Sequence, residues 1–331
     1  MLRFTIRRLL WIIPVLFSIA LVTFLLMHAA PGGPWDRNTD RRQLDAASQE
    51  RLNQEFGLDK PMWRQFVAYM VADINSEGEI VCGAICGNLG PSYRQRGRTV
   101  QEILFSAPEG KPIWESRFGY SVRLGLISLT FAILVGIPAG LLAALNRNTW
   151  IDYSSAMVAN FGVSVPSFVI GIYLIIIFGV MLHWVSVVPR SWGDPKVWVI
   201  PALVLGFGTM AFTARLTRSS VLEVLDQDYI RTARAKGVYE RAVILVHMLK
   251  NALIPVVTIL GPALAGLVVG SFIIETMFAF PGIGREYVQA ISNRDYSMIL
   301  GTTLVYGLLI TFANLSVDLL YGFLDPRIRV G

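Results

Sequence analysis

The chain has 331 residues, of which 54% are hydrophobic and only 16% are charged, and its formal net charge is +6. A soluble domain is typically about half apolar and about a quarter charged, and here the apolar residues stand in long runs, which indicates an integral membrane protein. The basic residues form no patch interleaved with aromatic residues, so the composition gives no reason to expect nucleic acid as a partner.

Six uncharged runs predict transmembrane helices, because about 20 apolar residues cross the hydrocarbon core of a bilayer in helical form. The runs are Leu9–Met27, Leu124–Asn146, Tyr153–Pro189, Val197–Ala214, Asn251–Ile274 and Tyr296–Val317. The third run has 37 residues, too many for one straight span, so we expect part of it to lie at the interface or to bend at Pro166. A cleaved signal peptide is the alternative for the first run, but the run is long for one and His28-Ala29-Ala30 is not an A-x-A cleavage site.

Residues 31–119 form a polar segment of mixed charge between the first two runs. The pattern predicts a helix over Asp45–Phe56 that ends at Gly57, and a second helix capped by Asp59 with Pro61 in its first turn. Four residues would form an apolar face on this second helix: Trp63, Phe66, Val67 and Met70.

The distribution of Lys and Arg over the short loops predicts the orientation, since these residues are enriched on the cytoplasmic side. The N-terminus and residues 146–153, 215–250 and 323–331 together hold thirteen of them, whereas residues 184–198 and 279–295 hold four. The segment 31–119 is not counted, because long domains cross the membrane regardless of charge. The sequence therefore predicts cytoplasmic termini, a cytoplasmic 215–250 loop and an external 31–119 segment.

The two cysteines, Cys82 and Cys86, both fall in the external segment, where disulfides persist. Gly83 lies between them and gives the chain freedom to close a small ring. We therefore expect a disulfide. Free thiols or a contact with a partner remain the alternatives, because so short a loop gains little entropy from closure.

The 215–250 loop is a charged segment between long apolar runs, with seven basic and four acidic residues. No Gly or Pro falls between Thr209 and Lys236, so a helix could run through this stretch. Gly237 would then end it, as a glycine in left-handed conformation does. A second helical stretch, Val238–Leu253, is expected to follow.

The run Tyr-Ile-Arg-Thr-Ala-Arg-Ala-Lys-Gly at 229–237, followed eighteen residues later by Pro255, resembles the "EAA" loop of bacterial ABC-importer permeases. More narrowly, it resembles the B-type permease of dipeptide, oligopeptide and nickel importers. It departs from the motif that gives the loop its name: Tyr229–Ala233 stands where other importers have Glu-Ala-Ala. This variant is usual in the peptide branch. Further stretches resemble the same family in the same order: Phe56–Pro61, Gly87–Tyr93, Phe280–Gly284, and Asn314–Tyr321 with Asp325-Pro326-Arg327.

The resemblance implies an all-α integral membrane protein with the type I ABC-importer permease fold, six transmembrane helices and an extracytoplasmic domain between helices 1 and 2. The implied division is 1–30 (N-terminus and first helix), 31–119 (extracytoplasmic scaffold), 120–322 (five-helix core with coupling loop 215–250) and 323–331 (cytoplasmic tail). The implied location is the bacterial cytoplasmic membrane. The implied partners are a homologous C-type permease, two ATP-binding subunits that carry ATP and Mg, and an extracytoplasmic solute-binding protein. No cofactor is expected on this chain.

In such a permease the coupling loop docks on an ATP-hydrolysing subunit. The residues expected to make this contact are Tyr229, Arg231, Thr232, Ala233, Arg234, Ala235, Lys236 and Gly237. Among them, the small residues Ala233, Ala235 and Gly237 would let another backbone come close. The alternative is an ordinary cytoplasmic loop with solvated charges.

Polar residues at membrane depth are candidates for lining the translocation pathway, because such groups are functional hypotheses by default. They are Asn160 and Ser164, which share a helix face, Asn314 in the last run, and Glu275 at the outer end of the fifth. Asp318 is expected to have a structural role instead. Gly and Pro residues in the runs would allow either close helix packing or a hinged gate.

The implied function is a permease that moves peptides across the membrane, driven by ATP hydrolysis on separate subunits. Nickel chelates or another small solute are the alternative within the family. An ion-driven secondary transporter would need mid-membrane carboxylates or an inverted repeat, and the sequence shows neither. An enzyme is the weakest alternative, because the sequence has no GxxxxGK[ST] motif, no His/Cys cluster with metal-site spacing and no recognisable nucleophile–base pair.

Overall fold

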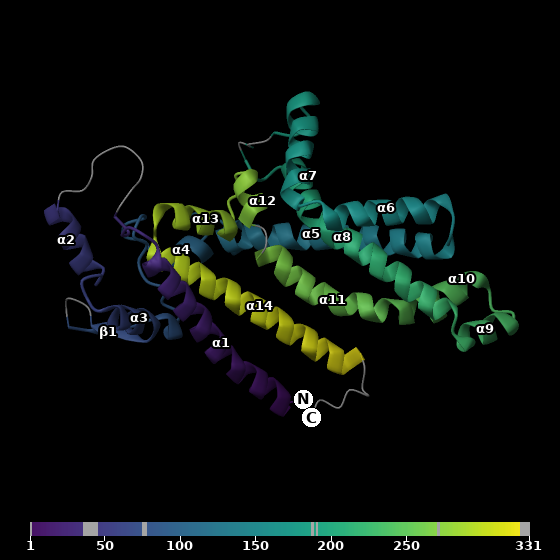
Figure 1. Cartoon of the computed structure of the whole chain (residues 1–331), viewed down its shortest axis with the longest axis horizontal. Coiled ribbons are helices and arrows are strands. Elements are labelled where there is room, and N and C mark those ends of the chain that lie inside the picture. The colour runs from purple at the N-terminus through teal and green to yellow at the C-terminus, as the bar shows by residue number, and fades with distance from the viewer. Residues whose placement is uncertain are drawn as a thin grey trace. The chain divides into compact units, whose positions relative to one another are not determined.

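The computed structural model describes residues 2–35, 46–74, 78–186, 189, 191–269 and 272–324 (Figure 1). These residues are mostly helical, with one short two-stranded antiparallel sheet formed by β1 (Ala72–Ile74) and β2 (Ile80–Cys82). The sheet was not expected from the sequence. The predicted Asp325-Pro326-Arg327 tail lies outside the described residues.

Contacts between Cα atoms divide the chain into two compact units. Unit 1 contains Met1–Thr5, Ser121–Phe280 and Phe312–Gly331, and unit 2 contains Ile6–Tyr120 and Pro281–Thr311. Unit 2 therefore combines the predicted external segment with most of the first helix and with a later stretch. The four predicted domain boundaries stay a prediction.

Unit 1 is a helical bundle in which α6, α7 and α11 pack against α8. Its elements are α5 (Arg117–Leu145), α6 (Trp150–Ser164), α7 (Ser167–Leu174), the π-helical η3 (Ile175–Met181), α8 (Lys196–Leu225), α9 (Asp228–Ala235), α10 (Glu240–Ala242), the π-helical η4 (Val243–Met248), α11 (Leu249–Val269), α12 (Phe272–Met277) and the C-terminal end of α14 (Tyr296–Leu324). Buried residues recur along α8 from Val197 to Val221, which makes it the central helix of the unit.

Small residues let α5 and α6 approach α8 closely. A Cβ at Gly136 would lie 2.8 Å from the carbonyl oxygen of Met210, and one at Gly162 would lie 2.6 Å from the Cβ of Ala211. Real Cβ atoms do not approach other atoms this closely, so the glycines are needed where they stand. At these two positions the structure favours close packing over a hinge.

Five helical stretches among the described residues are long and apolar enough to cross a membrane: Thr5–Ala29, Arg117–Leu145, Lys196–Leu225, Glu240–Met277 and Tyr296–Ser316. A sixth candidate is the pair α6 and α7–η3, which is bent by 105°. The bend falls at Pro166, as predicted, because proline lacks a backbone N–H and keeps the preceding residue out of the helical region. In Figure 1, α7 accordingly stands across α6 and α8.

Unit 2 is built around most of α1 (Leu2–Ala29), from Ile6 onward, and the part of α14 up to Thr311. Its other elements are α2 (Ala46–Glu55), α3 (Met62–Met70), β1, β2, the short η1 (Ala84–Cys86), α4 (Val100–Phe105), η2 (Ile113–Glu115) and α13 (Ile283–Asn293). Asp295 caps α14, since its Oδ1 accepts from the N–H of Met298 at 3.1 Å. Its Oδ2 accepts from Ser92 Oγ at 2.5 Å and so fixes the loop before α4.

Two local expectations were wrong. The helix expected through Lys236 ends at Leu225, because Gln227 is extended and a new helix starts at Asp228. Asp59 does not cap α3, whose N-cap is Pro61 without a side-chain bond. The turn is held instead by Gln65 Nε2, which donates to the carbonyls of Leu58 and Lys60.

Candidate functional site

The exposed end of unit 1 is formed by α9, the Gly237 bend and α10. Asp228 stands in the first turn of α9, where a negative charge interacts favourably with the positive end of the helix dipole. Arg234 lies in its last turn, where positive charge is favourable. The charge pattern therefore supports a separate short helix after the break at Gln227.

Gly237 ends α9 in the left-handed conformation, with φ of +73°. Its N–H donates to the carbonyl of Arg234 at 3.0 Å, and the N–H of Val238 donates to the carbonyl of Ala233 at 3.2 Å. These two bonds define a Schellman motif, which satisfies helix-end carbonyls that would otherwise lack donors. The predicted left-handed glycine is thus confirmed.

One face of α9 packs against the rest of unit 1. Ile230 is fully buried and Ala233 is 8% exposed, in a cluster with Ala144, Val221, Val243, Met248 and Ala252. Burying a side chain of the size of Ile230 contributes about 1.5–3 kcal/mol. Because this cluster also contains residues of α5, α8, η4 and α11, a displacement of α9 would be transmitted to these helices through packed side chains.

Two polar contacts fix the bend. Arg234 donates to Glu240 through both Nη2 (2.6 Å) and Nε (3.2 Å), which ties the end of α9 to the start of α10. Tyr229 Oη accepts from Asn251 Nδ2 at 3.0 Å, which ties the start of α9 to α11. Neither contact was expected from the sequence, and the spacing of Arg234 and Glu240 around a glycine was the available signal.

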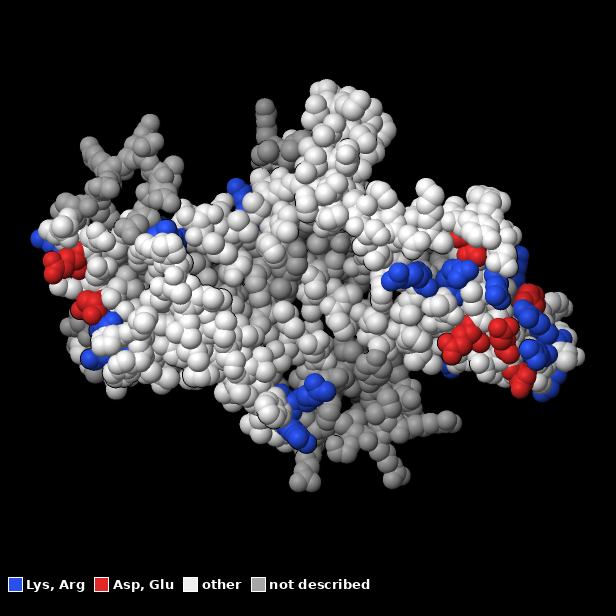
Figure 2. All heavy atoms as spheres, in the orientation of Figure 1, with Lys and Arg blue, Asp and Glu red and all other residues white. Residues whose placement is uncertain are grey.

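The opposite face of α9 is exposed. The exposed residues among the predicted contact set are Tyr229, Arg231, Thr232, Arg234, Ala235, Lys236 and Gly237. Figure 2 shows Lys, Arg, Asp and Glu side chains gathered at this end of unit 1, at the right of the view. The expectation for Ala233 needs correction: its methyl points into the cluster and supports α9 from within, so Ala235 and Gly237 are the small residues available to a partner.

A buried ion pair lies at the start of α6. Arg218 of α8 donates to both carboxylate oxygens of Asp152, from Nε at 2.5 Å and from Nη2 at 2.8 Å. The backbone N–H of Asn148 donates to the same carboxylate at 3.0 Å. Asp152 is 3% exposed. The pair joins the loop before α6 to the helix that leads into α9, and sequence reasoning missed it because the partners are far apart in the chain.

The predicted pathway residues take different positions. Asn160 and Ser164 are both exposed on α6, and Asn314 is exposed on α14. Glu275 differs from the expectation, because its side chain is fully buried and accepts from Ser121 Oγ at 2.6 Å. It is therefore enclosed between α12 and α5, and a role in lining the pathway stays a prediction for all four residues. The side chain of Asp318 lies outside the described set.

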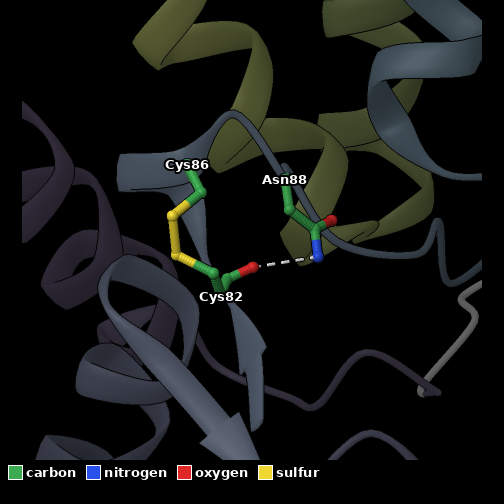
Figure 3. The surroundings of a disulfide bond; sticks show 3 residues. All are labelled: Cys82, Cys86 and Asn88. Atoms are coloured by element: carbon green, nitrogen blue, oxygen red, sulfur yellow. Dashed lines mark hydrogen bonds between the residues drawn. A yellow bond between two sulfur atoms is a disulfide. The ribbon is translucent and has the colours of Figure 1, made fainter.

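Cys82 and Cys86 are joined by a disulfide between β2 and η1, with Cα atoms 5.9 Å apart (Figure 3). Asn88 closes the loop from the other side, since its Nδ2 donates to the carbonyl of Cys82 at 3.1 Å. A Cβ at Gly83 would lie 2.9 Å from the carbonyl carbon of Tyr69, so this glycine allows the loop to pack on the end of α3.

Within the part of the chain that the structure describes, no group of three or more His, Cys, Asp or Glu side chains is placed to hold a metal ion. The chemistry of the exposed end of unit 1 is that of a contact surface, with mixed charges around small residues. The loop surface 228–242 is therefore the candidate functional site.

Comparison with known proteins identifies the kind of molecule to which this surface belongs. A family model described as "Binding-protein-dependent transport system inner membrane component" matches residues 136–330, and a model of the N-terminal part of such components matches residues 1–110. The chain is 36% identical over 329 residues to the oligopeptide transport system permease protein OppB of Escherichia coli (strain K12), which covers 99% of this chain and 100% of that protein. It is 37% identical over 330 residues to the dipeptide transport system permease protein DppB of Bacillus subtilis (strain 168), covering 100% and 99% respectively.

Among solved structures, an inward-facing form of the MetNI methionine ABC transporter is similar, with a TM-score of 0.52 and 18% identity, over 63% of this chain and 94% of that chain. Identity this low shows the fold alone, which is that of an ABC-importer permease. The chain belongs to the family of binding-protein-dependent transport system inner membrane components, and within it is similar to the OppB and DppB permeases.

Proposed function

We propose that this chain is one of two permease subunits of an ABC importer that carries di- or oligopeptides across the bacterial cytoplasmic membrane. The proposal for the solute is supported by similarity along the full chain to relatives named for oligopeptides and dipeptides. The observation that carries the mechanism is the exposed, charged α9–Gly237–α10 surface, rigidly bent by the Schellman motif and the Arg234–Glu240 pair.

The surface has the properties needed to transmit force from a partner. Its buried face packs on residues of α5, α8, η4 and α11 through Ile230 and Ala233, so a push on α9 is passed to helices that run through the bundle. Its exposed face offers Ala235 and Gly237, beside which a partner can approach closely, and charged residues that can pair with acidic and basic groups. An ATP-binding subunit that closes on ATP would supply the push.

The remaining parts of the proposal follow from this role. Both termini and the 228–242 surface face the cytoplasm, the predicted six spans cross the membrane, and residues 31–119 lie outside. A homologous second permease completes the pathway, two ATP-binding subunits hold ATP and Mg, and a solute-binding protein delivers peptide from outside. This chain binds no cofactor of its own.

Reconstitution tests the proposal. The chain is co-expressed with the subunits encoded beside it, purified, and placed in liposomes, and uptake of labelled dipeptides, pentapeptides and nickel–histidine chelate is measured with the solute-binding protein and ATP. We expect ATP-dependent peptide uptake that disappears when this chain or the second permease is omitted. Uptake of nickel chelate alone would overturn the peptide assignment, and uptake by this chain as the sole membrane subunit would overturn the heterodimer.

A further inference from the structure

Helix α3 of unit 2 has three different sides. Phe66 and Met70 are buried, at 7% exposure each, and form a central strip. On one flank, Gln65 reaches His28 of α1, with 3.2 Å between Gln65 Oε1 and His28 Nε2. On the other flank, Trp63, Val67 and Val71, the residue just after the helix, follow one another at intervals of four residues and are 70%, 44% and 49% exposed. Among the residues that the structure describes, none covers this apolar flank of the helix.

The contacts of Phe66 fix the depth of α3 along α1. Its ring centroid lies 5.5 Å from that of Phe17 and 5.3 Å from that of Phe24. Phe17 and Phe24 are two helical turns apart, so Phe66 sits between them. At a rise of about 1.5 Å per residue, Phe17 is about 15 Å from Met27, the end of the uncharged run.

This depth lies within the hydrocarbon region. The hydrocarbon core of a bilayer is about 30 Å thick, so one leaflet occupies about 15 Å. The stretch from Phe17 to Met27 therefore spans one leaflet, and α3 packs beside it rather than beyond it. The flanking residues of α1 at the same level, Val22, Leu25 and Leu26, are exposed and apolar and belong to a candidate membrane span.

Two polar contacts of α3 and the turn before it face away from the apolar flank, whereas Arg64 is exposed at the edge of that flank, where its long side chain can extend toward the headgroups. Gln65 meets His28 just past the end of the uncharged run, and Lys60, which precedes the helix, pairs with Asp73 at 2.7 Å. A tryptophan beside an apolar surface, with polar groups on the opposite flank, is typical of helices that lie at the boundary of headgroups and acyl chains. The apolar surface then extends to Ile85, which is 71% exposed, because Gly83 N–H donates to the carbonyl of Val71 at 2.8 Å and holds η1 against the end of α3.

We propose that α3 is a membrane-interface helix whose Trp63–Val67–Val71 flank is buried among the acyl chains of one leaflet, so that lipid is its partner. The proposed orientation makes this the outer leaflet, but the depth follows from α1 whichever way the chain faces. Unit 2 is then anchored to the bilayer at two places, through α1 and through α3.

Site-directed spin labelling tests this inference in the whole complex, reconstituted in nanodiscs of phosphatidylcholine and phosphatidylglycerol. A nitroxide is attached to Trp63→Cys or Val67→Cys, and its collisions with oxygen, which partitions into acyl chains, and with a water-soluble nickel chelate are compared. Both positions are exposed, so the label does not disturb the core. The disulfide-bonded Cys82 and Cys86 take no label without reductant.

Two variants calibrate the measurement. Leu26 on α1 is 66% exposed, so a label on Leu26→Cys gives the response expected in lipid. Glu50 on α2 is exposed and polar, so a label on Glu50→Cys gives the response expected in water. We expect labels at 63 and 67 to resemble Leu26→Cys, with increased oxygen collisions and loss of nickel collisions. A response like that of Glu50→Cys, or shielding from both reagents as by a covering protein, would overturn the proposal. Neither result depends on which solute is carried or on which side faces the cytoplasm.

Discussion

Arg234 and Glu240 form an ion pair across Gly237, through two hydrogen bonds of 2.6 and 3.2 Å that join the end of α9 to the start of α10. Because the Glu240 carboxylate accepts from the charged guanidinium, the pair raises the pKa of Arg234 above its usual value. Both side chains are partly exposed, so the pair adds little to stability. Its consequence is geometric, because it holds the angle at which α9 meets a partner.

A charge swap distinguishes this geometric role from direct contact with the partner. Arg234→Glu or Glu240→Arg alone places like charges across the bend, and we expect either to reduce peptide-stimulated ATP hydrolysis in the reconstituted complex. The double variant restores an opposite pair, so activity should recover substantially. Failure of the double variant to recover would mean that Arg234 acts through the ATP-binding subunit instead.

Substitutions on the exposed face test docking itself. A Cβ at Gly237 would meet no atom within 4 Å, so the main cost of Gly237→Val is the left-handed backbone, about 1–2 kcal/mol. Ala235→Trp is accommodated by solvent in this chain but would overpack a docked partner, at about 1–3 kcal/mol. Both should insert normally and lose transport and peptide-stimulated ATP hydrolysis.

Two controls accompany these variants. Arg147→Ala, exposed in the other predicted cytoplasmic loop, should change transport much less. Ala233→Trp should instead lower the yield of folded protein, because Ala233 is buried in the cluster under α9. Wild-type transport by Gly237→Val and Ala235→Trp at normal membrane levels would show that the surface is a solvated loop.

Local patterns in the sequence were enough to predict the helical class, the bend at Pro166 and the left-handed Gly237. Each of these depends on local chemistry: run length, the missing N–H of proline and the freedom of glycine at positive φ. The family resemblance was carried by contiguous motifs and was confirmed by comparison along the whole chain.

Features set by contacts between distant segments could not be predicted. The inward position of Ala233 follows from the break at Gln227, which turns α9 so that Ile230 and Ala233 reach Met248 and Ala252. The enclosure of Glu275 depends on Ser121, and the pairing of Asp152 depends on Arg218. For Glu275 and Asp152 the polar residue is visible in the sequence, but its partner in a distant segment is not.

The Arg218–Asp152 pair should contribute to stability as well as position. Removing one member of a buried ion pair costs about 3–5 kcal/mol, and because Arg218 is about one-third exposed we expect Arg218→Ala to cost less than this. Thermal unfolding of the detergent-solubilised complex should show a lowered midpoint. Arg215→Ala, exposed on the same helix, is the matched control and should change it little. Equal midpoints for the two variants would show that the pair is not stabilising.

The disulfide can be tested by mass spectrometry after alkylation of the unfolded chain without reductant. We expect Cys82 and Cys86 to remain unalkylated and to become alkylated only after reduction. Cys82→Ser should still fold, since a loop this short gains little from closure and Asn88 also holds it. Detection of two alkylated thiols in unreduced protein would contradict the pairing.

The orientation can be tested by labelling single cysteines in intact cells, in a Cys82→Ser/Cys86→Ser background. Trp35 Nε1 donates to Asn53 Oδ1 at 2.8 Å, so the nearby exposed Glu50 is the better external position. Gln227, exposed at the break before α9, is the internal position. We expect Glu50→Cys to react with an impermeant maleimide in intact cells and Gln227→Cys to react only after lysis. The reverse pattern would place α9 outside the cell, where no ATP-binding subunit could reach it, and would remove the basis for coupling through this surface.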